Sequence, residues 1–415
     1  MQSPPLFESD AVVLGILFVI LLAIFRTAAS KNPFWRKFYT IVPSVLLCYF
    51  IPGILNTLNI INGAKSELYY VSSRYLLPSS LLLFTISIDL KEVLRLGSKA
   101  IIVFLSGTVG IILGGPIAFI VINSFAPDVL GGTGENAVWR GMTTIAGSWI
   151  GGGANQAAMK EVFEVGNTIF PAMLAVDIIV ANVWTGILLY GSGRSAIIDR
   201  LFNADASAID TVEKKIREYQ ISIARLPSMA DTMTVLGVAF GFTGLSHFLA
   251  NQIAPWIQLN APHLAKFSLT SSFFWIVVVA TTAGLVLSFT RLRKLEGVGA
   301  SRFASVMLYV LVASIGMQMD ILAIFTNPGL FMLGAIWMTI HILVMLTVAK
   351  IIKAPFFFVA VGSQANVGGA ASAPIVASAF SPSLAPVGVL LAVLGYAVGT
   401  YGAWLCGIIL QFLAG

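Results

Sequence analysis

Two stretches of this chain combine glycines with hydroxyl and amide side chains inside otherwise apolar sequence. They cover residues 147–156 and 362–372. The second follows the first at an offset of 215 positions, and the same offset pairs Thr185 with Thr400. Glycine-broken segments at matching places in two halves of a membrane protein are the best sequence indication of a transporter binding site. The alternative is that these glycines only let helices pack closely.

The side chains of these two stretches can bind a small polar solute. Hydroxyls and amides offer both donors and acceptors, unwound carbonyls can ligate Na⁺, and the N-termini of half-helices attract anionic groups. The predicted solute-binding residues are Ser148, Asn155, Gln156, Ser363, Gln364, Asn366 and Ser372. The predicted backbone hinges, where positive φ or close approach is expected, are Gly151, Gly152, Gly153, Gly368 and Gly369.

Asp177 is the acid expected to carry a coupling ion. It stands in an apolar helix that follows the first glycine-rich stretch, where a carboxylate must be paired, solvated or protonated. Asn182 and Thr185 are expected along the same helix face, with Thr400 as the counterpart of Thr185. The alternative places Asp177 near enough to the membrane surface to be solvated.

An oxygen cage around Asp177 is the most specific expectation for the coupling ion. Asn155 would complete its first wall, and Ser363 and Asn366 would supply a second wall across a pseudo-two-fold axis. His341 lies alone in an apolar segment and is expected to be an inter-helix hydrogen bonder rather than a proton relay.

The composition identifies the class of protein. The chain has 415 residues, of which 58% are hydrophobic and 10% charged, with mean hydropathy +0.92. Soluble domains carry about 25% charged residues, so an integral, multi-pass protein of a cell membrane is expected, embedded in the lipid bilayer. The net charge of +6 lies in short loops and therefore favours the membrane rather than a nucleic-acid partner. No Lys or Arg precedes the first apolar run, so that run is expected to be a retained helix rather than a cleaved signal peptide.

Neither catalysis nor a cofactor is expected. Cys48 and Cys406 both lie in apolar segments, and no disulfide framework or metal-ligand spacing is visible. No Ser-His-Asp set and no phosphate loop occurs in the sequence. The protein is therefore predicted to be no enzyme, to need no cofactor, and to bind no metal beyond Na⁺.

Apolar segments predict a helical protein with many spans. The spans are expected at residues 11–28, 39–61, 70–90, 100–124, 170–190, 231–253, 270–290, 302–325, 330–349 and 386–412, with broken segments at 137–162 and 355–378. Two of these spans end on an aspartate, Asp89 and Asp320. Between the halves, residues 209–223 repeat apolar side chains at helical spacing and predict a surface amphipathic helix.

The distribution of Lys and Arg predicts the topology. Five loops, at residues 26–37, 91–99, 191–229, 291–302 and 350–353, hold 19 of the 24 positive residues. All five are cytoplasmic only if each broken segment is a re-entrant hairpin that enters and leaves on one side. A broken helix that crosses fully remains the alternative, if one span elsewhere is miscounted.

These observations predict the fold class and its division. We expect an all-α polytopic membrane protein with two inverted repeats of about five transmembrane helices. Each repeat would hold a glycine-rich broken or re-entrant helical element in a core domain. The first repeat covers residues 1–190, a cytoplasmic linker with the amphipathic helix covers 191–229, and the second repeat covers 230–415.

The glycine-rich stretches and the helix of Asp177 resemble the uncharacterised membrane protein family that includes YjcL, over nearly the whole chain. That family is similar to the superfamily of cation/proton antiporters and anion transporters, alongside sodium–glutamate symporters. The resemblance implies inverted repeats, crossing broken elements in a core domain, and a homodimer. Antiporters of the superfamily carry an acidic pair or Asn-Asp after the first broken element, whereas Val176 precedes Asp177 here.

We therefore expect a secondary active transporter of a small organic solute, anionic or zwitterionic, such as an amino acid, a carboxylate or a small peptide. It would work by alternating access, coupled to Na⁺ or H⁺. The alternative is a monovalent cation/proton antiporter. A membrane scaffold or sensor would explain the central loop but not the matched broken segments.

Overall fold

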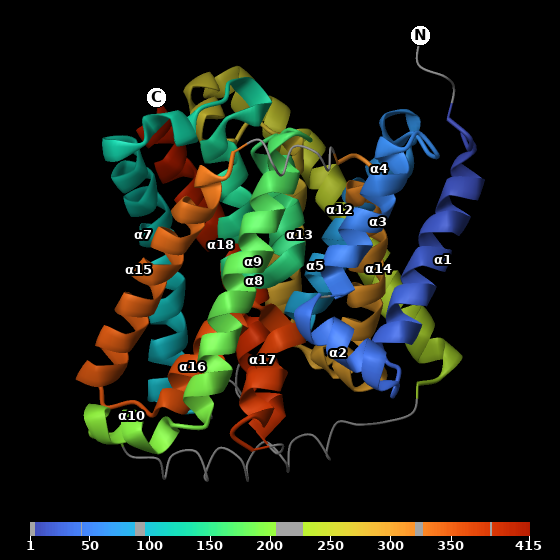
Figure 1. Cartoon of the computed structure of the whole chain (residues 1–415). Helices are drawn as coiled ribbons and strands as arrows, with labels where there is room; N and C mark the ends of the chain where they lie inside the picture. Colours follow the sequence, from blue (N-terminus) through green and yellow to red (C-terminus); the bar gives the residue numbers. More distant parts are fainter. Residues whose placement is uncertain (1–4, 43, 88–95, 205–226, 320–326, 382–383) are drawn as a thin grey trace.

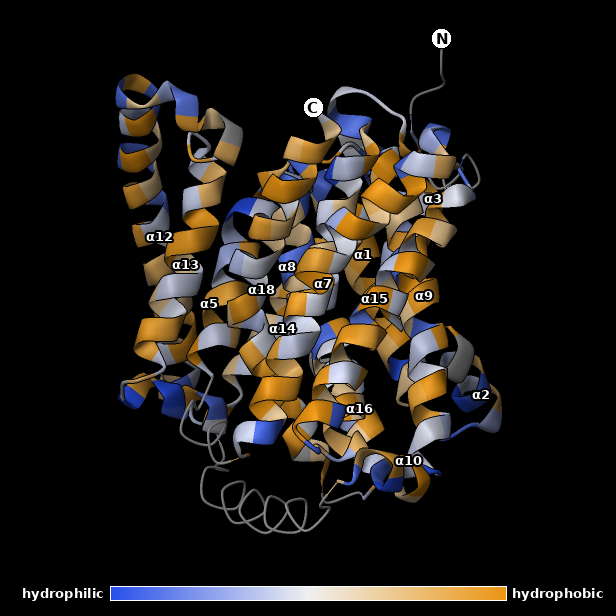
Figure 2. Cartoon of the chain, turned by 90° about the vertical axis from the view of Figure 1, so that its left-hand side faces the viewer, coloured by the Kyte–Doolittle hydropathy of each residue, from blue (hydrophilic) through white to orange (hydrophobic). Residues whose placement is uncertain are grey.

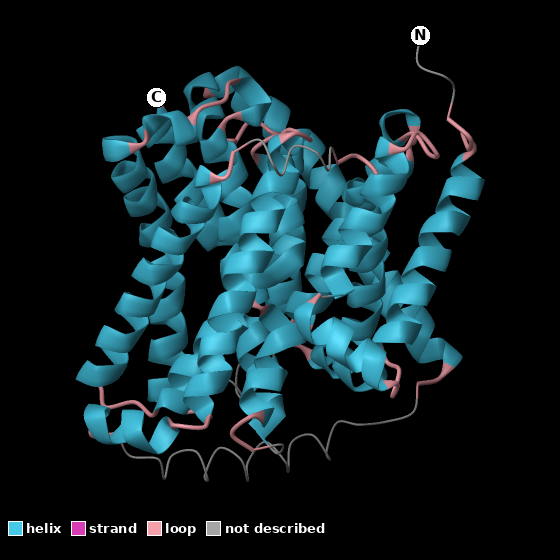
Figure 3. Ribbon diagram, in the orientation of Figure 1, coloured by secondary structure: helices cyan, strands magenta, loops and turns pink. Residues whose placement is uncertain are grey.

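Every secondary-structure element of the described chain is helical (Figure 3). The computed structural model describes residues 5–42, 44–87, 96–204, 227–319, 327–381 and 384–415. Within these residues, six helices are long and apolar enough to cross a membrane, or up to eight if each of two bent helix pairs is one span. The expected all-α polytopic membrane protein is thereby confirmed.

The helices begin and end close to the apolar segments of the sequence. Their bounds are α1 Asp10–Ala28, α2 Pro33–Ile41, α3 Ser44–Thr57, α4 Leu68–Val71, α5 Leu77–Ile86, α7 Ser98–Phe125, α8 Val138–Val162, α9 Ile169–Ser192, α10 Ser195–Phe202, α12 Met229–Asn260, α13 Ser272–Leu287, α14 Ala300–Gly316, α15 Gly329–Ile351, α16 Phe356–Val367, α17 Gly369–Ser378 and α18 Ala385–Ala414. Short helical turns connect them, among them η1 Gly63–Lys65, η2 Ser72–Leu76, η3 Pro127–Leu130, η5 Pro262–Phe267 and η6 Arg291–Val298.

Two expected spans differ from the structure, and three other expected features fall outside the described residues. The third expected span begins with α4 and a π-helical turn, η2, before α5 continues it. The helix of the span expected at 302–325, α14, ends at Gly316, earlier than expected. Asp89, Asp320 and the predicted amphipathic helix at 209–223 lie outside the described residues.

The helices pack in two groups that each draw on both halves of the chain. In the first, which we call the core group, α8 packs along α18 and α7 along α15, with α9, α16 and α17 beside them (Figure 1). In the second, the frame group, α5 packs against α13 and α14, α3 against α14, and α12 against α13, with η2 and α4 packed on α14. Figure 2 shows hydrophobic residues along the lengths of the helices and hydrophilic ones gathered at their ends, as a lipid surrounding requires.

Glycines of α7 let α15 approach closely. A Cβ on Gly114 would lie 2.7 Å from Cδ1 of Trp337, and one on Gly110 would lie 3.1 Å from Cα of His341. The Trp337 indole donates to the carbonyl of Ile111 at 2.8 Å. Small residues on one helix and large ones on the next are the usual packing of membrane helices, and here they hold the core group together.

The described parts of the positive loops lie at one end of the molecule, the lower end in Figure 1. There α2 and α10 lie, and α9 and α15 also end there. If this end is cytoplasmic, single cysteines replacing Arg36, Arg194 or Arg293 should resist an impermeant thiol reagent added outside cells, whereas one replacing Lys65 should react. The native Cys48 and Cys406 are buried, so their background should be low. Labelling at Arg194 from outside would contradict this topology.

Candidate functional site

Helix α8 folds back on itself at Gly152, which has φ 73° and ψ −172°, a conformation essentially restricted to glycine. The two arms run side by side, because a Cβ on Gly147 would lie 2.5 Å from the carbonyl oxygen of Asn155. Its two ends also meet, since the Gly166 N–H donates to the Glu135 carbonyl at 2.7 Å. Of the two alternatives that the sequence left open, the structure has the hairpin, and we call it the first hairpin.

Helices α16 and α17 form a second hairpin. The chain turns at Gly369, which has φ 58°. Phe380, just beyond α17, packs its ring 5.2 Å from that of Phe357 at the start of α16. The Phe356 N–H donates to Asp199 of α10 at 2.7 Å, so the second hairpin is anchored at the lower end of the molecule (Figure 1).

The tips of the two hairpins meet inside the core group. An ideal Cβ on Gly369 would lie 3.8 Å from Cα of Gly152. Gly151 and Gly368 are needed for close approach, because a Cβ would lie 2.2 Å from Asn155 Nδ2 in the first case and 2.3 Å from Gln364 Nε2 in the second. Gly153 does not meet the expectation of a hinge: its φ is not positive, and a Cβ would contact only a Leu308 methyl at 3.9 Å.

The Asp177 carboxylate is buried against the first hairpin and is 4% exposed, which excludes the solvated position. Its Oδ1 accepts from the Trp149 indole at 2.6 Å and its Oδ2 from the Gln156 amide at 2.8 Å. Ser148 is a third hydrogen-bonding partner. Within the part of the chain that the structure describes, Asp177 has no ion pair with a Lys, Arg or His. A carboxylate is thus held by neutral donors alone.

Two amides at matching places in the hairpins, Asn155 and Asn366, tie each hairpin to a neighbouring helix. Asn155 donates to a carbonyl of α18 at 3.1 Å and accepts from Thr400 at 2.6 Å. Asn366 donates to a carbonyl of α7 at 3.0 Å and accepts from Thr108 at 2.8 Å. Each amide is satisfied by protein groups, so these two residues position the hairpins.

His341 links three helices, as expected for an inter-helix hydrogen bonder. Its Nδ1 lies 2.9 Å from the Gly107 carbonyl, which can only accept, so Nδ1 carries the hydrogen. Its Nε2 lies 2.8 Å from Oγ of Ser363, which also accepts from the Trp184 indole at 2.8 Å. Neutral His341 then accepts from the Ser363 hydroxyl, and every polar atom in this chain of contacts has a partner.

The expected oxygen cage around Asp177 does not form as predicted. Ser363 and Asn366 contact the groups just named and not Asp177. Asn182 is exposed and donates to the carbonyl of its own helix at Ile178. Five residues turn a helix by about 140° relative to Asp177, so the two side chains cannot share a face.

The remaining predicted residues, Thr185 and Ser372, form hydrogen bonds at the second hairpin. Thr185 donates to Gln364 at 3.1 Å and so joins α9 to the second hairpin rather than to Asp177. Ser372 donates to the Gly368 carbonyl at 3.3 Å and is half-buried. The predicted residues thus gather around the two hairpins, in several separate hydrogen-bonding sets.

Sequence reasoning missed an ion pair and a buried cation at the contact between the core and frame groups. Arg74 of η2 and Glu161 of α8 are 2.6 Å apart, and the neighbouring Lys160 is 5% exposed. It also missed the Trp149 indole as a hydrogen-bonding partner of Asp177. Arg74 and Lys160 were visible as positive residues outside the five rich loops, and isolated charges in apolar surroundings are expected to be functional.

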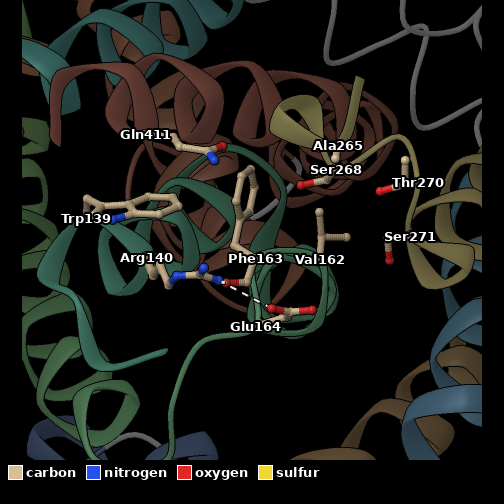
Figure 4. A pocket seen from close by; sticks show the side chains of 10 residues that line it. All are labelled: Trp139, Arg140, Val162, Phe163, Glu164, Ala265, Ser268, Thr270, Ser271 and Gln411. Atoms are coloured by element: carbon tan, nitrogen blue, oxygen red, sulfur yellow. Dashed lines mark hydrogen bonds and ion pairs between the residues drawn. The ribbon is translucent and has the colours of Figure 1, made fainter. Parts of the chain in front are cut away.

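A polar cavity of about 300 Å³ lies at the base of the first hairpin, between η5 and the end of α18. In Figure 4 the Arg140 guanidinium points toward Glu164, with Nη1 and Oε2 3.7 Å apart. No residue predicted from the sequence lines it. The lining residues are Trp139, Arg140, Val162, Phe163, Glu164, Ala265, Ser268, Thr270, Ser271 and Gln411.

Comparison with known proteins gives one family and one curated relative. Residues 15–413 match the family model described as "Protein of unknown function (DUF819)". The chain is 23% identical over 350 residues to the uncharacterized membrane protein YjcL of Bacillus subtilis (strain 168). That match covers 81% of this chain and 82% of the relative.

Proposed function

This chain belongs to the DUF819 family, whose description names no activity, and we propose that it is a secondary active transporter of a small organic solute. The solute is anionic or zwitterionic, and its movement is coupled to Na⁺ or H⁺. The observation that carries the proposal is the meeting of two glycine-turned hairpins, Gly152 against Gly369, inside a membrane protein. Irregular backbone at such a place is tolerated only when it is buried in protein or lines a polar cavity.

The packing of the helices supports alternating access. The core group holds both hairpins, and it contacts the frame group less extensively than its own members contact one another. Across that contact, the rings of Phe84 and Tyr396 stack at 4.2 Å and Thr281 lies 3.3 Å from Thr400. A shift of one group against the other would break few contacts and would leave both hairpins within the core group.

The proposed division of roles follows from the contacts. Gly152 and Gly369 shape the tips, and Ser148, Gln156 and Gln364 supply polar groups near them. Asp177 carries the coupling ion, because it is the buried acid without a cation partner among the described residues. Two inverted repeats, a homodimer and a place in the cell membrane complete the proposal.

A monovalent cation/proton antiporter is the second candidate, and Asp177 is the observation that favours it. A buried carboxylate that can exchange a proton for a cation needs no organic solute. The hairpins favour the first candidate, because Ser148, Gln156 and Gln364 offer an organic solute hydroxyl and amide groups near the tips.

Uptake into proteoliposomes tests both candidates. We expect labelled amino acids or carboxylates to accumulate when a Na⁺ or a proton gradient is imposed, each gradient being applied separately. Liposomes without protein are the control. Cation-dependent proton efflux in the absence of any organic solute, together with no solute uptake, would favour the antiporter. Neither activity, in correctly inserted protein, would contradict a transport function.

A further inference from the structure

Tyr49 of α3 carries a buried hydroxyl without a partner. The side chain is 1% exposed, and its hydroxyl is the one buried side-chain polar atom without a hydrogen bond among the described residues. A phenol O–H both donates and accepts, and leaving it unpaired in a protein interior is costly. The orphan hydroxyl therefore points to a group that binds there.

Lys160 of the first hairpin is a buried cation with one hydrogen-bonding partner. Its Nζ donates to the Tyr69 hydroxyl of α4 at 3.0 Å, whereas an ammonium group has three hydrogens to donate. It has no ion pair in the described parts of the chain, because its neighbour Glu161 is held by Arg74. Glu135 is exposed and acts on Lys160 only at longer range.

Both groups lie beside one aromatic ring, that of Phe170 at the start of α9. The Lys160 Nζ lies 5.7 Å from the centroid of the Phe170 ring, and the centroids of the Tyr49 and Phe170 rings are 6.0 Å apart. Tyr49 and Tyr69 belong to the frame group, whereas Lys160 and Phe170 belong to the core group. The cluster therefore spans the contact between the two groups.

The charges of the cluster define what it can bind. Arg74 and Glu161 form an ion pair, which leaves Lys160 as the cation of this cluster without a salt-bridge partner among the described residues. The free hydrogens belong to an ammonium and a phenol, both of which can donate to an anion. One cation with extra donors suits a carboxylate, which carries one charge and accepts several hydrogen bonds.

We propose that Lys160 and Tyr49, packed on Phe170, bind the carboxylate of the transported solute. This rests on the proposed function and narrows the solute to a carboxylate-bearing organic molecule.

Thermal unfolding of the whole protein in detergent, at constant ionic strength, measures this binding without transport. Sodium acetate, succinate and glycine are the carboxylate probes, and ethylamine and chloride are the comparison ligands. At least one carboxylate probe should raise the unfolding midpoint of the unaltered protein by a few degrees at saturation. Ethylamine and chloride should not.

Lys160→Met and Tyr49→Phe should lose this shift and should unfold, without ligand, at the same or a higher temperature. Both replacements remove a buried, incompletely paired polar group while keeping the side-chain shape, which tends to stabilise a fold. Lys65→Met and Tyr70→Phe change exposed side chains at the same end of the molecule and should keep the full shift.

Two results would overturn the assignment: no carboxylate raises the midpoint of the unaltered protein, or both variants keep the shift. Uptake in proteoliposomes separates this failure from that of the proposed function. Gradient-driven uptake that is unaffected by Lys160→Met would preserve the transporter and remove the carboxylate site. Carboxylate binding without any uptake would preserve the carboxylate site and contradict the transporter.

Discussion

Asp177→Asn should abolish gradient-driven accumulation of solute while the protein still folds and inserts. The amide keeps the shape of the carboxylate. Its oxygen can accept from the Trp149 indole, and Gln156 can reverse its own amide so that its oxygen accepts from the new N–H group. The variant therefore loses the charge without leaving a buried donor unpaired. Accumulation should fall to the level of empty liposomes, whereas exchange of solute across the membrane should persist.

Asp128→Asn is the matched control, because it makes the same chemical change at an exposed acid in η3. Its accumulation should be unchanged. If Asp177→Asn accumulates solute normally and keeps its dependence on Na⁺ or pH, the acid is structural. The coupling ion would then be held by backbone carbonyls and hydroxyls.

Gly152→Ala and Gly369→Ala should each impair transport severely, since both residues hold positive φ at the hairpin tips. There is room for a Cβ, with the nearest atoms 3.6 Å away at Gly152 and 3.8 Å away at Gly369. The cost is therefore backbone strain, about 1–3 kcal/mol at Gly152 and about 1–2 kcal/mol at Gly369. We expect initial uptake rates to fall sharply in proteoliposomes that contain equal amounts of protein.

Gly153→Ala provides a control one residue away. Gly153 has helical backbone and open space, so alanine should stabilise its arm of the hairpin by up to about 1 kcal/mol. Uptake should be nearly normal. Equal losses in all three variants would mean that any added methyl group disturbs the hairpins. Normal uptake in Gly152→Ala and Gly369→Ala would reduce these glycines to a detail of packing.

The polar side chains of the molecule differ in whether protein groups already fill their hydrogen bonds. Asn155 and Asn366 were predicted to touch solute, yet each is saturated by a carbonyl and a threonine hydroxyl of a neighbouring helix. Lys160 and Tyr49 have groups left over and were not predicted. Which polar groups have hydrogen bonds left over thus depends on tertiary contacts and does not follow from residue type.

The sequence alone determined the class of the protein, the places of its helices and the two breaks. These properties are local, because a span is set by the length of an apolar run and a turn at positive φ needs glycine. It also indicated which loops lie together, since the excess of Lys and Arg is counted along the chain.

Only the tertiary structure decided which side chains meet. Trp149 and Asp177 are 28 residues apart, and Thr108 and Asn366 are 258 apart, so no local pattern pairs them. The direction of a side chain depends on the rotation of its helix, which packing sets. Asn182 faces outward for this reason although it lies only five residues from a buried acid. The same reason brings Lys160, Tyr49 and Phe170 together from three separate helices.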